Sequence, residues 1–370
     1  MKIVHVISGL GLGGAEGVLC RLCLDTRDLE HVIVALSLGE SRFSDSLLDS
    51  GIKVLRFNLK SPFFLLILLK IILSIRSERP DLIQGWMYHG DLVSAVAGLF
   101  LRLPVAWNVR HSNITLKFKN APLLAVTFIN AILSWLVPVQ IFTCAKEATR
   151  SHGNVGYCVR KFTTIPNGFD RSKFDLHQYT ALPYSVAPLT FGMLARFHPQ
   201  KGHSVLLDAC KILQRRGMDF RLILGGSGVD AANRDLMDIV DNHNLSRQVE
   251  LVGEVKNGSE FMQLIDVHIL SSTSGEGFPN VVAEACLCGL VTIVTDVGDS
   301  SSVSKGTGWV VQPGSAKELA DAMEDILLNY QRSDLSKLGH QACKKVSEAY
   351  SLSRMSGEYR TAWSAIVANQ

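Results

Sequence analysis

Two carboxylates lie close together in one short segment, where they could accept hydrogen bonds from a ligand. Glu276 and Glu284 are separated by seven residues within Glu-Gly-Phe-Pro-Asn-Val-Val-Ala-Glu-Ala, and Glu284 falls among small and apolar residues. A carboxylate on an apolar helix face is costly unless something donates hydrogen bonds to it, and vicinal sugar hydroxyls would do so. A helix cap followed by a core glutamate that is satisfied within the protein is the alternative, and the chemistry alone leaves both open.

The elements around this pair would place it at a ligand-binding edge. The apolar run Val267–Leu270 predicts a buried strand, and Pro279 suits the first turn of a helix. Gly289 is suited to end that helix, and Leu290–Val294 predicts the next strand. A loop and a helix N-terminus therefore follow a strand end, where open α/β sheets bind ligands and where a helix dipole favours an anion.

A basic pair follows another predicted strand. Arg196 and Lys201 come after Leu189–Leu194, five residues apart in one loop. A guanidinium acts as a fork and an ammonium as a point charge, so the two could converge on a diphosphate. An ordinary surface pair is the alternative.

A glycine-rich loop follows the first strand. Gly9-Leu-Gly-Leu-Gly13-Gly14 comes after Ile3–Ile7 and opens a helix, which is the setting of a phosphate-binding loop. The spacing is not G-x-G-x-x-G, and the second strand, His31–Leu36, lacks the acidic residue that would bind a ribose, so a dinucleotide site is disfavoured. A tight turn that needs glycine for its backbone is the alternative.

These motifs together resemble the retaining family-4 glycosyltransferases. The two glutamates match the E-x7-E motif, and the basic loop is similar to the family's G-R-L-x-x-x-K-G segment, with Ala195 in place of the first glycine. Ile165-Pro-Asn167-Gly168-Phe-Asp170 resembles the hinge turn that closes the family's first domain. The resemblance covers nearly the whole chain. It implies an α/β protein of the GT-B fold, in which two Rossmann-like domains with doubly wound parallel sheets face a central cleft.

The resemblance also implies roles for individual residues. The catalytic set comprises Glu276 at the donor sugar, Arg196 and Lys201 at the leaving diphosphate, and His111 beside the sugar, although a lone histidine can also be structural. In the donor site, Glu284 would hold the ribose. The other donor-binding residues would be Gly277, Phe278, Pro279, Asn280, Gly13, Gly14 and Gly226. Acceptor binding falls to Glu16, His89 and Arg110; the alternative for the segment around His89 is a helix start capped by Asp91.

No metal or cofactor is expected, and the donor nucleotide sugar acts as a co-substrate. The sequence has no Asp-x-Asp, which argues against a metal-bridged diphosphate and favours the basic pair. One departure from the family concerns Ser300–Ser302, where members often carry an acidic residue.

Alternating strands and helical stretches predict βαβ units with parallel sheets. We expect an acceptor-binding domain over residues 1–175, a nucleotide-sugar-binding domain over 176–350, and a C-terminal helix over 351–370 that crosses back to the first domain. Within the first domain, a helix is expected over Leu92–Leu101 and a long apolar helix near 121–137.

Composition narrows the class of protein and its partners. The 370 residues are 47% hydrophobic and 19% charged, which excludes a disordered or fibrous chain. Residues 1–175 carry a net charge of +7 and the remainder −4, so an anionic partner such as a lipid surface or a diphosphate suits the first half, and nothing indicates nucleic acid. The spacing of the eight cysteines does not match a zinc site, so we expect them to be buried thiols.

Location follows from the start of the chain and from its apolar stretches. The sequence opens on a strand, so we expect no secretory leader and a cytoplasmic location. Ala121–Gln140 is uncharged over about 20 residues, near the length of a membrane span. Its Thr127, Asn130 and Ser134 favour a buried or interfacial helix, which leaves room for peripheral contact with an anionic inner leaflet.

The expected function is retaining, metal-independent transfer of a sugar from a nucleotide sugar, with UDP favoured, to a hydroxyl of a saccharide on a lipid diphosphate. The setting would be synthesis of a bacterial surface polysaccharide of the O-antigen or capsule kind. Two alternatives remain: an epimerase or phosphorylase on the same fold, and a non-catalytic nucleotide-binding membrane scaffold.

Overall fold

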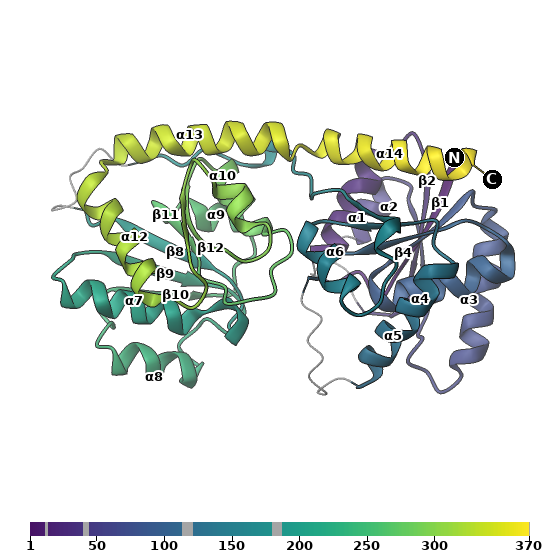
Figure 1. Cartoon of the computed structure of the whole chain (residues 1–370), viewed down its shortest axis with the longest axis horizontal. Coiled ribbons are helices and arrows are strands. Elements are labelled where there is room, and N and C mark those ends of the chain that lie inside the picture. The colour runs from purple at the N-terminus through teal and green to yellow at the C-terminus, as the bar shows by residue number, and fades with distance from the viewer. Residues whose placement is uncertain (12–13, 40–43, 113–120, 180–186, 370) are drawn as a thin grey trace. The chain divides into compact units, whose positions relative to one another are not determined.

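The computed structural model describes residues 1–11, 14–39, 44–112, 121–179 and 187–369, and the chain divides into two compact units (Figure 1). Unit 1 comprises Met1–Gly168 and Leu352–Gln370, and unit 2 comprises Phe169–Ser351. The division falls between Gly168 and Phe169, and the Phe169 ring packs on Phe278 of unit 2, at 6.1 Å between centroids.

Unit 1 is built on a parallel sheet of seven strands in the order β3-β2-β1-β4-β5-β6-β7. The strands are β1 Lys2–Ile7, β2 Glu30–Ala35, β3 Lys53–Arg56, β4 Leu82–Trp86, β5 Val105–Val109, β6 Gln140–Thr143 and β7 Phe162–Thr164. The four strands β1, β2, β4 and β5 are apolar and almost wholly buried, as expected for a parallel sheet covered on both faces.

Helices cover both faces of this sheet. The helices of unit 1 are α1 Gly14–Asp25, α2 Ser44–Asp49, α3 Phe64–Glu78, α4 Met87–Leu101, α5 Ala121–Leu136, α6 Lys146–Gly153 and α14 Leu352–Ala368. Residues of α1 and α14 share a core with Ile3, Ile7 and Leu82, while α3 and α4 pack on Val4, Val6 and Ile83 of the opposite face. On that second face α5 packs beside α4, against Trp107 and Ile141.

The C-terminal helix α14 is held to unit 1 by buried polar contacts as well as by its apolar side. Trp363 Nε1 donates to Gln84 Oε1 of β4 at 2.6 Å, and Asn108 Nδ2 of β5 donates to the Tyr359 hydroxyl at 2.8 Å. Arg360 forms an ion pair with Asp28. In Figure 1 the helix (yellow) lies beside α1.

Unit 2 repeats the architecture with six parallel strands in the order β10-β9-β8-β11-β12-β13. The strands are β8 Thr190–Leu194, β9 Arg221–Gly225, β10 Val249–Gly253, β11 Val267–Leu270, β12 Val291–Thr295 and β13 Trp309–Val311. The helices are α7 His203–Arg215, α8 Arg234–Asn242, α9 Gly258–Met262, α10 Asn280–Leu287, α11 Ser300–Ser304, α12 Ala316–Asn329 and α13 Arg332–Ala349. The predicted fold class, α/β with two doubly wound parallel sheets, is confirmed.

Each sheet has one point where the strand order reverses. In unit 1 successive strands run outward from β1 in one direction and from β4 in the other, and in unit 2 the reversal lies between β8 and β11. Loops that leave two such neighbouring strands diverge to opposite faces and open a crevice at the carboxyl edge, which is where α/β sheets bind ligands.

Two helix starts differ from the sequence prediction. Helix α4 begins at Met87 instead of Leu92, because Met87 takes a left-handed conformation (φ 63°) directly after β4 and turns the chain at once. Asp91 is consequently an interior residue of α4, and its alternative role as the N-cap is wrong. Pro279 stands at the N-cap of α10 rather than inside the first turn.

Candidate active site

The reversal point in the unit 2 sheet has the predicted basic loop on one side and the first glutamate on the other. Lys201 ends a short 3-10 helix, Pro199–Lys201, that follows β8, and Glu276 lies in the loop that follows β11. Because β8 and β11 are parallel neighbours, both loops leave the same edge of the sheet. Lys201 and Glu276, 75 positions apart, are thereby brought together.

The two side chains form an ion pair. Lys201 Nζ lies 2.5 Å from Glu276 Oε1, and the same oxygen accepts a 2.6 Å hydrogen bond from Ser272 Oγ. The lysine side chain is 20% exposed and the glutamate side chain 11%, so the charges are partly shielded from water, which strengthens their attraction. Ser272 escaped the sequence analysis; a hydroxyl four positions before the glutamate in the same loop was the available signal.

Glycines let these loops approach closely. Gly202 has φ 69°, and a Cβ added there would stand 2.1 Å from the carbonyl oxygen of Ser271. Ser271 Oγ donates to the carbonyl oxygens of Lys201 and Gly202 at 3.0 and 3.1 Å. The loop after β8 is thus fastened to the end of β11, which fixes the backbone beside Lys201.

Arg196 reaches solvent from the same loop. Its side chain is exposed, while the backbone on either side is anchored: Ala195 N donates to the Gly225 carbonyl at 2.9 Å and Phe197 N to the Ser227 carbonyl at 2.8 Å. A Cβ at Gly226 would lie 2.2 Å from the Ala195 carbonyl oxygen, so Gly226 is required for this approach. The backbone of the loop is therefore anchored on both sides of Arg196, whose side chain is exposed.

Helix α10 carries the second glutamate, Glu284, next to helix α9. Glu284 Oε2 lies 3.4 Å from where a Cβ of Gly258 would stand, so its carboxylate borders the start of α9. The Phe278 ring is 7% exposed and packs edge-to-face on Tyr350 at 4.9 Å between centroids. Gly277 accepts a 3.1 Å hydrogen bond at its carbonyl from Asp299 N, and Asn280 begins the helix. The donor-binding roles of these residues stay predictions.

The predicted residues of unit 1 follow the ends of three neighbouring strands. Glu16 lies in the first turn of α1 after β1, His89 in the first turn of α4 after β4, and His111 two positions after the end of β5. The His89 pKa is lowered, first by partial desolvation and then by Lys60. Gly14 begins α1, whereas Gly13 lies outside the described residues. Their roles at an acceptor, and that of His111 in catalysis, stay predictions.

Arg110 has structural partners that the sequence did not reveal. Its guanidinium donates to Asn108 Oδ1 at 3.1 Å, to the Tyr359 hydroxyl at 2.7 Å, and to Asn167 of the Pro-Asn-Gly turn. It also lies over the Trp86 ring, 5.4 Å from the centroid. The side chain therefore connects α14 and the turn to the sheet, and its contact with an acceptor stays a prediction.

Asp91 is buried inside α4 rather than capping it. The residue has no exposed surface, Asn108 N reaches its Oδ1 at 3.5 Å, and Oδ2 has no hydrogen-bond partner among the described residues. Burial raises the pKa of this carboxyl well above its ordinary value.

One group of metal-ligand types comes together in the described residues: His5, Cys23 and His31, all buried in unit 1. Trp86 Nε1 lies 3.1 Å from His5 Nδ1, His5 Nε2 lies 3.1 Å from His31 Nδ1, and His31 Nε2 lies 2.9 Å from Thr26 Oγ1. All four ring nitrogens thus have hydrogen-bond partners. Burial lowers the pKa of His31 to about 4, and burial together with His31 lowers that of His5 well below its ordinary value.

In the part of the chain that the structure describes, no helix has both the length and the apolarity to cross a membrane. The eight cysteines are all buried and unbonded to one another.

Comparison with known proteins finds similarity to glycosyltransferases. Residues 188–329, which contain β8 to β13, match the model of the family described as glycosyl transferases group 1. The putative glycosyltransferase EpsF of Bacillus subtilis is 24% identical over 96% of this chain and 97% of its own. The capsular polysaccharide biosynthesis glycosyltransferase CapM of Staphylococcus aureus is 24% identical over 77% of this chain and 76% of its own.

Solved structures share the fold along the full length. The Anabaena protein Alr3699/HepE, solved in complex with UDP, superimposes with a TM-score of 0.83 at 19% identity, covering 99% of this chain and 100% of its own. The same protein has also been solved with UDP-glucose, with a TM-score of 0.81. The segment that matches the family model includes Lys201 and Glu276. Residues 188–329 of the chain are thus similar to the glycosyl transferases group 1 family, and the chain has the GT-B fold.

Proposed function

We propose that this protein is a retaining, metal-independent hexosyltransferase that moves a sugar from a nucleotide sugar to a hydroxyl of a lipid-diphosphate-linked saccharide during synthesis of a bacterial surface polysaccharide. The observation that carries the proposal is the Lys201–Glu276 ion pair across the reversal point of the unit 2 sheet, within the residues matched by the family model. The capsule enzyme among the relatives supports the polysaccharide setting, and the UDP and UDP-glucose complexes of the Anabaena protein support a UDP donor.

The chemistry follows from where charge develops. As the bond between the anomeric carbon and the diphosphate breaks, negative charge grows on the leaving oxygens. Lys201 and Arg196 would stabilise that charge more in the transition state than in the ground state, and this difference accelerates the reaction. The acceptor hydroxyl attacks the face from which the diphosphate departs, so no enzymic nucleophile is needed. Glu276 positions the donor sugar and Lys201, and Glu284 holds the ribose.

On the acceptor side, Glu16, His89 and Arg110 are proposed to bind the saccharide, with His111 beside the reacting sugar. Donor contacts would also come from the backbone around Gly277–Asn280 and from Gly13, Gly14 and Gly226. The proposed place of action is the cytoplasmic face of the plasma membrane. This agrees with the net charge of +7 over residues 1–175, because an anionic lipid surface attracts a basic domain.

The test is transfer of labelled sugar from a panel of UDP-sugars to lipid-linked saccharides extracted from bacterial membranes. The proposal expects acceptor-dependent product whose new linkage has the anomeric configuration of the donor, read by NMR. Inversion would contradict the retaining mechanism. Epimerised or phosphorolysed donor in the absence of acceptor would favour the other reactions that this fold supports.

A further inference from the structure

Helix α5 of unit 1 has polar residues on its buried side and apolar residues on its exposed side, the reverse of an ordinary surface helix. Its buried side carries Thr127, Asn130 and Ser134, each with a hydrogen-bond partner inside the protein. Its outer side is apolar, with exposed fractions of 45 to 77% at Phe128, Ile129, Ile132, Trp135 and Leu136. A surface helix in a globular protein turns its apolar stripe to the core. The exposed apolar face of α5 therefore indicates a surface that contacts an apolar partner or a membrane.

Helix α3 exposes a second apolar stripe that ends in a cation. Leu66, Leu69 and Leu73 are 61, 52 and 52% exposed, and Arg76 continues their spacing of three or four residues on the same helix face. Phe63, Phe64 and Leu65 at the start of the helix are at least 51% exposed. Helices α3 and α5 both cover the sheet face on which α4 lies between them.

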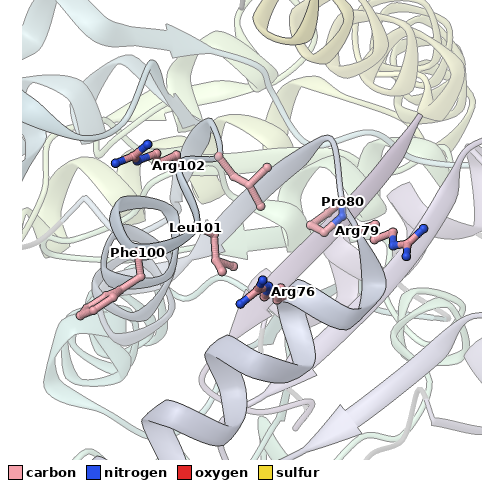
Figure 2. Close-up of a pocket in the computed structure, with 7 residues that line it drawn as sticks. Arg76, Arg79, Pro80, Phe100, Leu101 and Arg102 are labelled. Atoms are coloured by element: carbon pink, nitrogen blue, oxygen red, sulfur yellow. The ribbon is translucent and has the colours of Figure 1, made fainter.

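Three arginines gather where α3 and α4 end. A surface pocket of about 400 Å³ is lined by Arg76, Arg79 and Arg102 together with Phe100, which is 76% exposed (Figure 2). Arg79 and Arg102 are the C-caps of the two helices and both have left-handed backbones, with φ of 49° and 55°. Glycine or asparagine takes this conformation at less cost, so two arginines here are not explained by the backbone.

The charge of this surface is mainly positive; the exposed Asp81, next to Pro80, accepts a hydrogen bond from Lys2 N. None of the three guanidinium groups has a hydrogen bond or ion pair with any described residue. The acidic residues of the three helices, among those described, are Glu78, which is paired with Lys2 and Lys53, and the buried Asp91. A second copy of the chain would bring like charges face to face, whereas phosphate headgroups would complement them.

We propose that the outer surface of α3, α4 and α5 is a docking surface for an anionic phospholipid bilayer. The apolar side chains of α3 and α5 enter the interface between headgroups and acyl chains, and Arg76, Arg79 and Arg102 contact lipid phosphates. Figure 2 shows Arg76 between Arg79 and Arg102, whose side chains extend to opposite sides, an arrangement that suits several headgroups rather than one enclosed phosphate. The inference deepens the membrane location proposed above and rests on that function only for its biological setting.

Vesicle flotation tests the charge. The full chain is expected to float with vesicles of phosphatidylcholine and phosphatidylglycerol, and at least tenfold less with phosphatidylcholine alone. The triple variant Arg76→Gln/Arg79→Gln/Arg102→Gln is expected to lose at least tenfold in affinity for the anionic vesicles. The matched control is Arg215→Gln/Arg234→Gln/Arg247→Gln, which removes three exposed arginines of unit 2 and is expected to bind within twofold of the wild type. Equal losses of vesicle affinity in both triple variants would overturn the proposal, because they would mean that the net charge of the protein alone determines binding.

Trp135 reports insertion of the apolar face. Of the five tryptophans it is the exposed one, at 57%; Trp86, Trp107 and Trp363 are fully buried and Trp309 is half-buried. Vesicles with acyl chains brominated near the headgroup are expected to quench its fluorescence, and Trp135→Phe should abolish the quenching while keeping flotation. Leu69→Ser/Leu73→Ser should weaken flotation at least fivefold with an unchanged circular dichroism spectrum.

Absence of flotation on anionic vesicles, or binding without quenching, would overturn the docking surface. Donor binding, followed by a thermal shift with UDP-sugars, is independent of lipid, so failure of the docking surface and failure of the proposed glycosyl transfer can be told apart.

Discussion

Lys201 Nζ and Glu276 Oε1 lie 2.5 Å apart, across the point where the strand order of the unit 2 sheet reverses. Ser272 donates to the same carboxylate oxygen, so the glutamate is held from its own loop and in turn holds the lysine. An ammonium positioned in this way has lost its conformational freedom before any anion meets it. Preorganised charge of this kind costs little reorganisation when charge develops on a leaving group.

The first prediction is that Lys201 and Glu276 act as one unit in catalysis. Lys201→Met and Glu276→Gln should each lower kcat of sugar transfer by about 10² to 10³. The double variant should lose much less than the product of the two losses, because each single change already breaks the pair. The measurement is a double-mutant cycle on kcat and KM, with Lys337→Met, an exposed lysine of α13, as the control expected to match the wild type. Fully multiplicative losses would mean that the two residues act independently.

A second prediction concerns metal. The sequence has no Asp-x-Asp, and the proposed stabilisation of the diphosphate uses Arg196 and Lys201. Chelation with EDTA should therefore leave the transfer rate within twofold, and added Mg²⁺ or Mn²⁺ should not restore activity to Lys201→Met. A rate that collapses with EDTA and recovers with one divalent ion would show that a metal carries part of this charge.

The third prediction tests how α10 is seated. A Cβ at Gly339 of α13 would stand 1.7 Å from the carbonyl oxygen of Gly289, the residue after the C-cap of α10. Gly339→Ala should therefore lower the free energy of unfolding of unit 2 by about 1 to 3 kcal/mol, since backbone must shift to admit the methyl group. The control is Gly357→Ala in α14, where nothing lies within 4 Å and alanine should stabilise the helix by about 0.5 to 1 kcal/mol. Urea unfolding of both variants measures the difference, and equal effects at the two sites would contradict the packing described.

The fourth prediction is a pH dependence that arises in β11. His268 has no exposed surface, neither ring nitrogen has a partner among the described residues, and desolvation lowers its pKa to about 3. In the unfolded chain its pKa is about 6.5, so below that pH the unfolded state binds more protons and stability falls. The loss is absent above pH 6.5 and accumulates as the pH drops toward 3, at no more than about 1.4 kcal/mol per pH unit.

His268→Leu should remove this term. The variant should gain stability over the wild type by more at pH 5 than at pH 7.5, measured by urea unfolding at each pH. His340→Leu, at an exposed histidine, serves as the control and should show no such difference. A gain from His268→Leu that is the same at both values of pH would mean that the histidine is not held neutral.

The sequence predicted the architecture because strands buried on both faces of a sheet are short apolar runs, and those of β1, β4, β8 and β11 are unmistakable. Placement of Lys201 and Glu276 at one edge followed from the alternation of strands and helices. Which side chains meet there did not follow, because both glutamates come after β11 and the sequence does not show which of them the loop turns toward Lys201.

Long-range contacts account for most of what the sequence did not reveal. Arg110 contacts Tyr359, 249 positions away, and nothing near Arg110 in the sequence indicates that partner. Helix α13 was not predicted, because its glycine and its many polar residues obscure the helical spacing of its apolar residues. Only the packing of Gly339 against Gly289, next to α10, shows why that glycine is there. The turn at Met87 was not predicted, because nothing in the neighbouring sequence indicates that a methionine takes a left-handed backbone conformation.

The most direct test of the central claim, a donor site at the carboxyl edge of unit 2, is calorimetric titration with UDP and a panel of UDP-sugars. The account predicts that the wild type binds UDP, that Glu284→Gln weakens binding of UDP about tenfold or more through loss of a charged hydrogen bond to the ribose, and that Glu276→Gln changes UDP binding less than threefold while weakening the UDP-sugar. If no nucleotide or nucleotide sugar binds the wild type, or if Glu284→Gln binds UDP as the wild type does, the donor site described here is wrong.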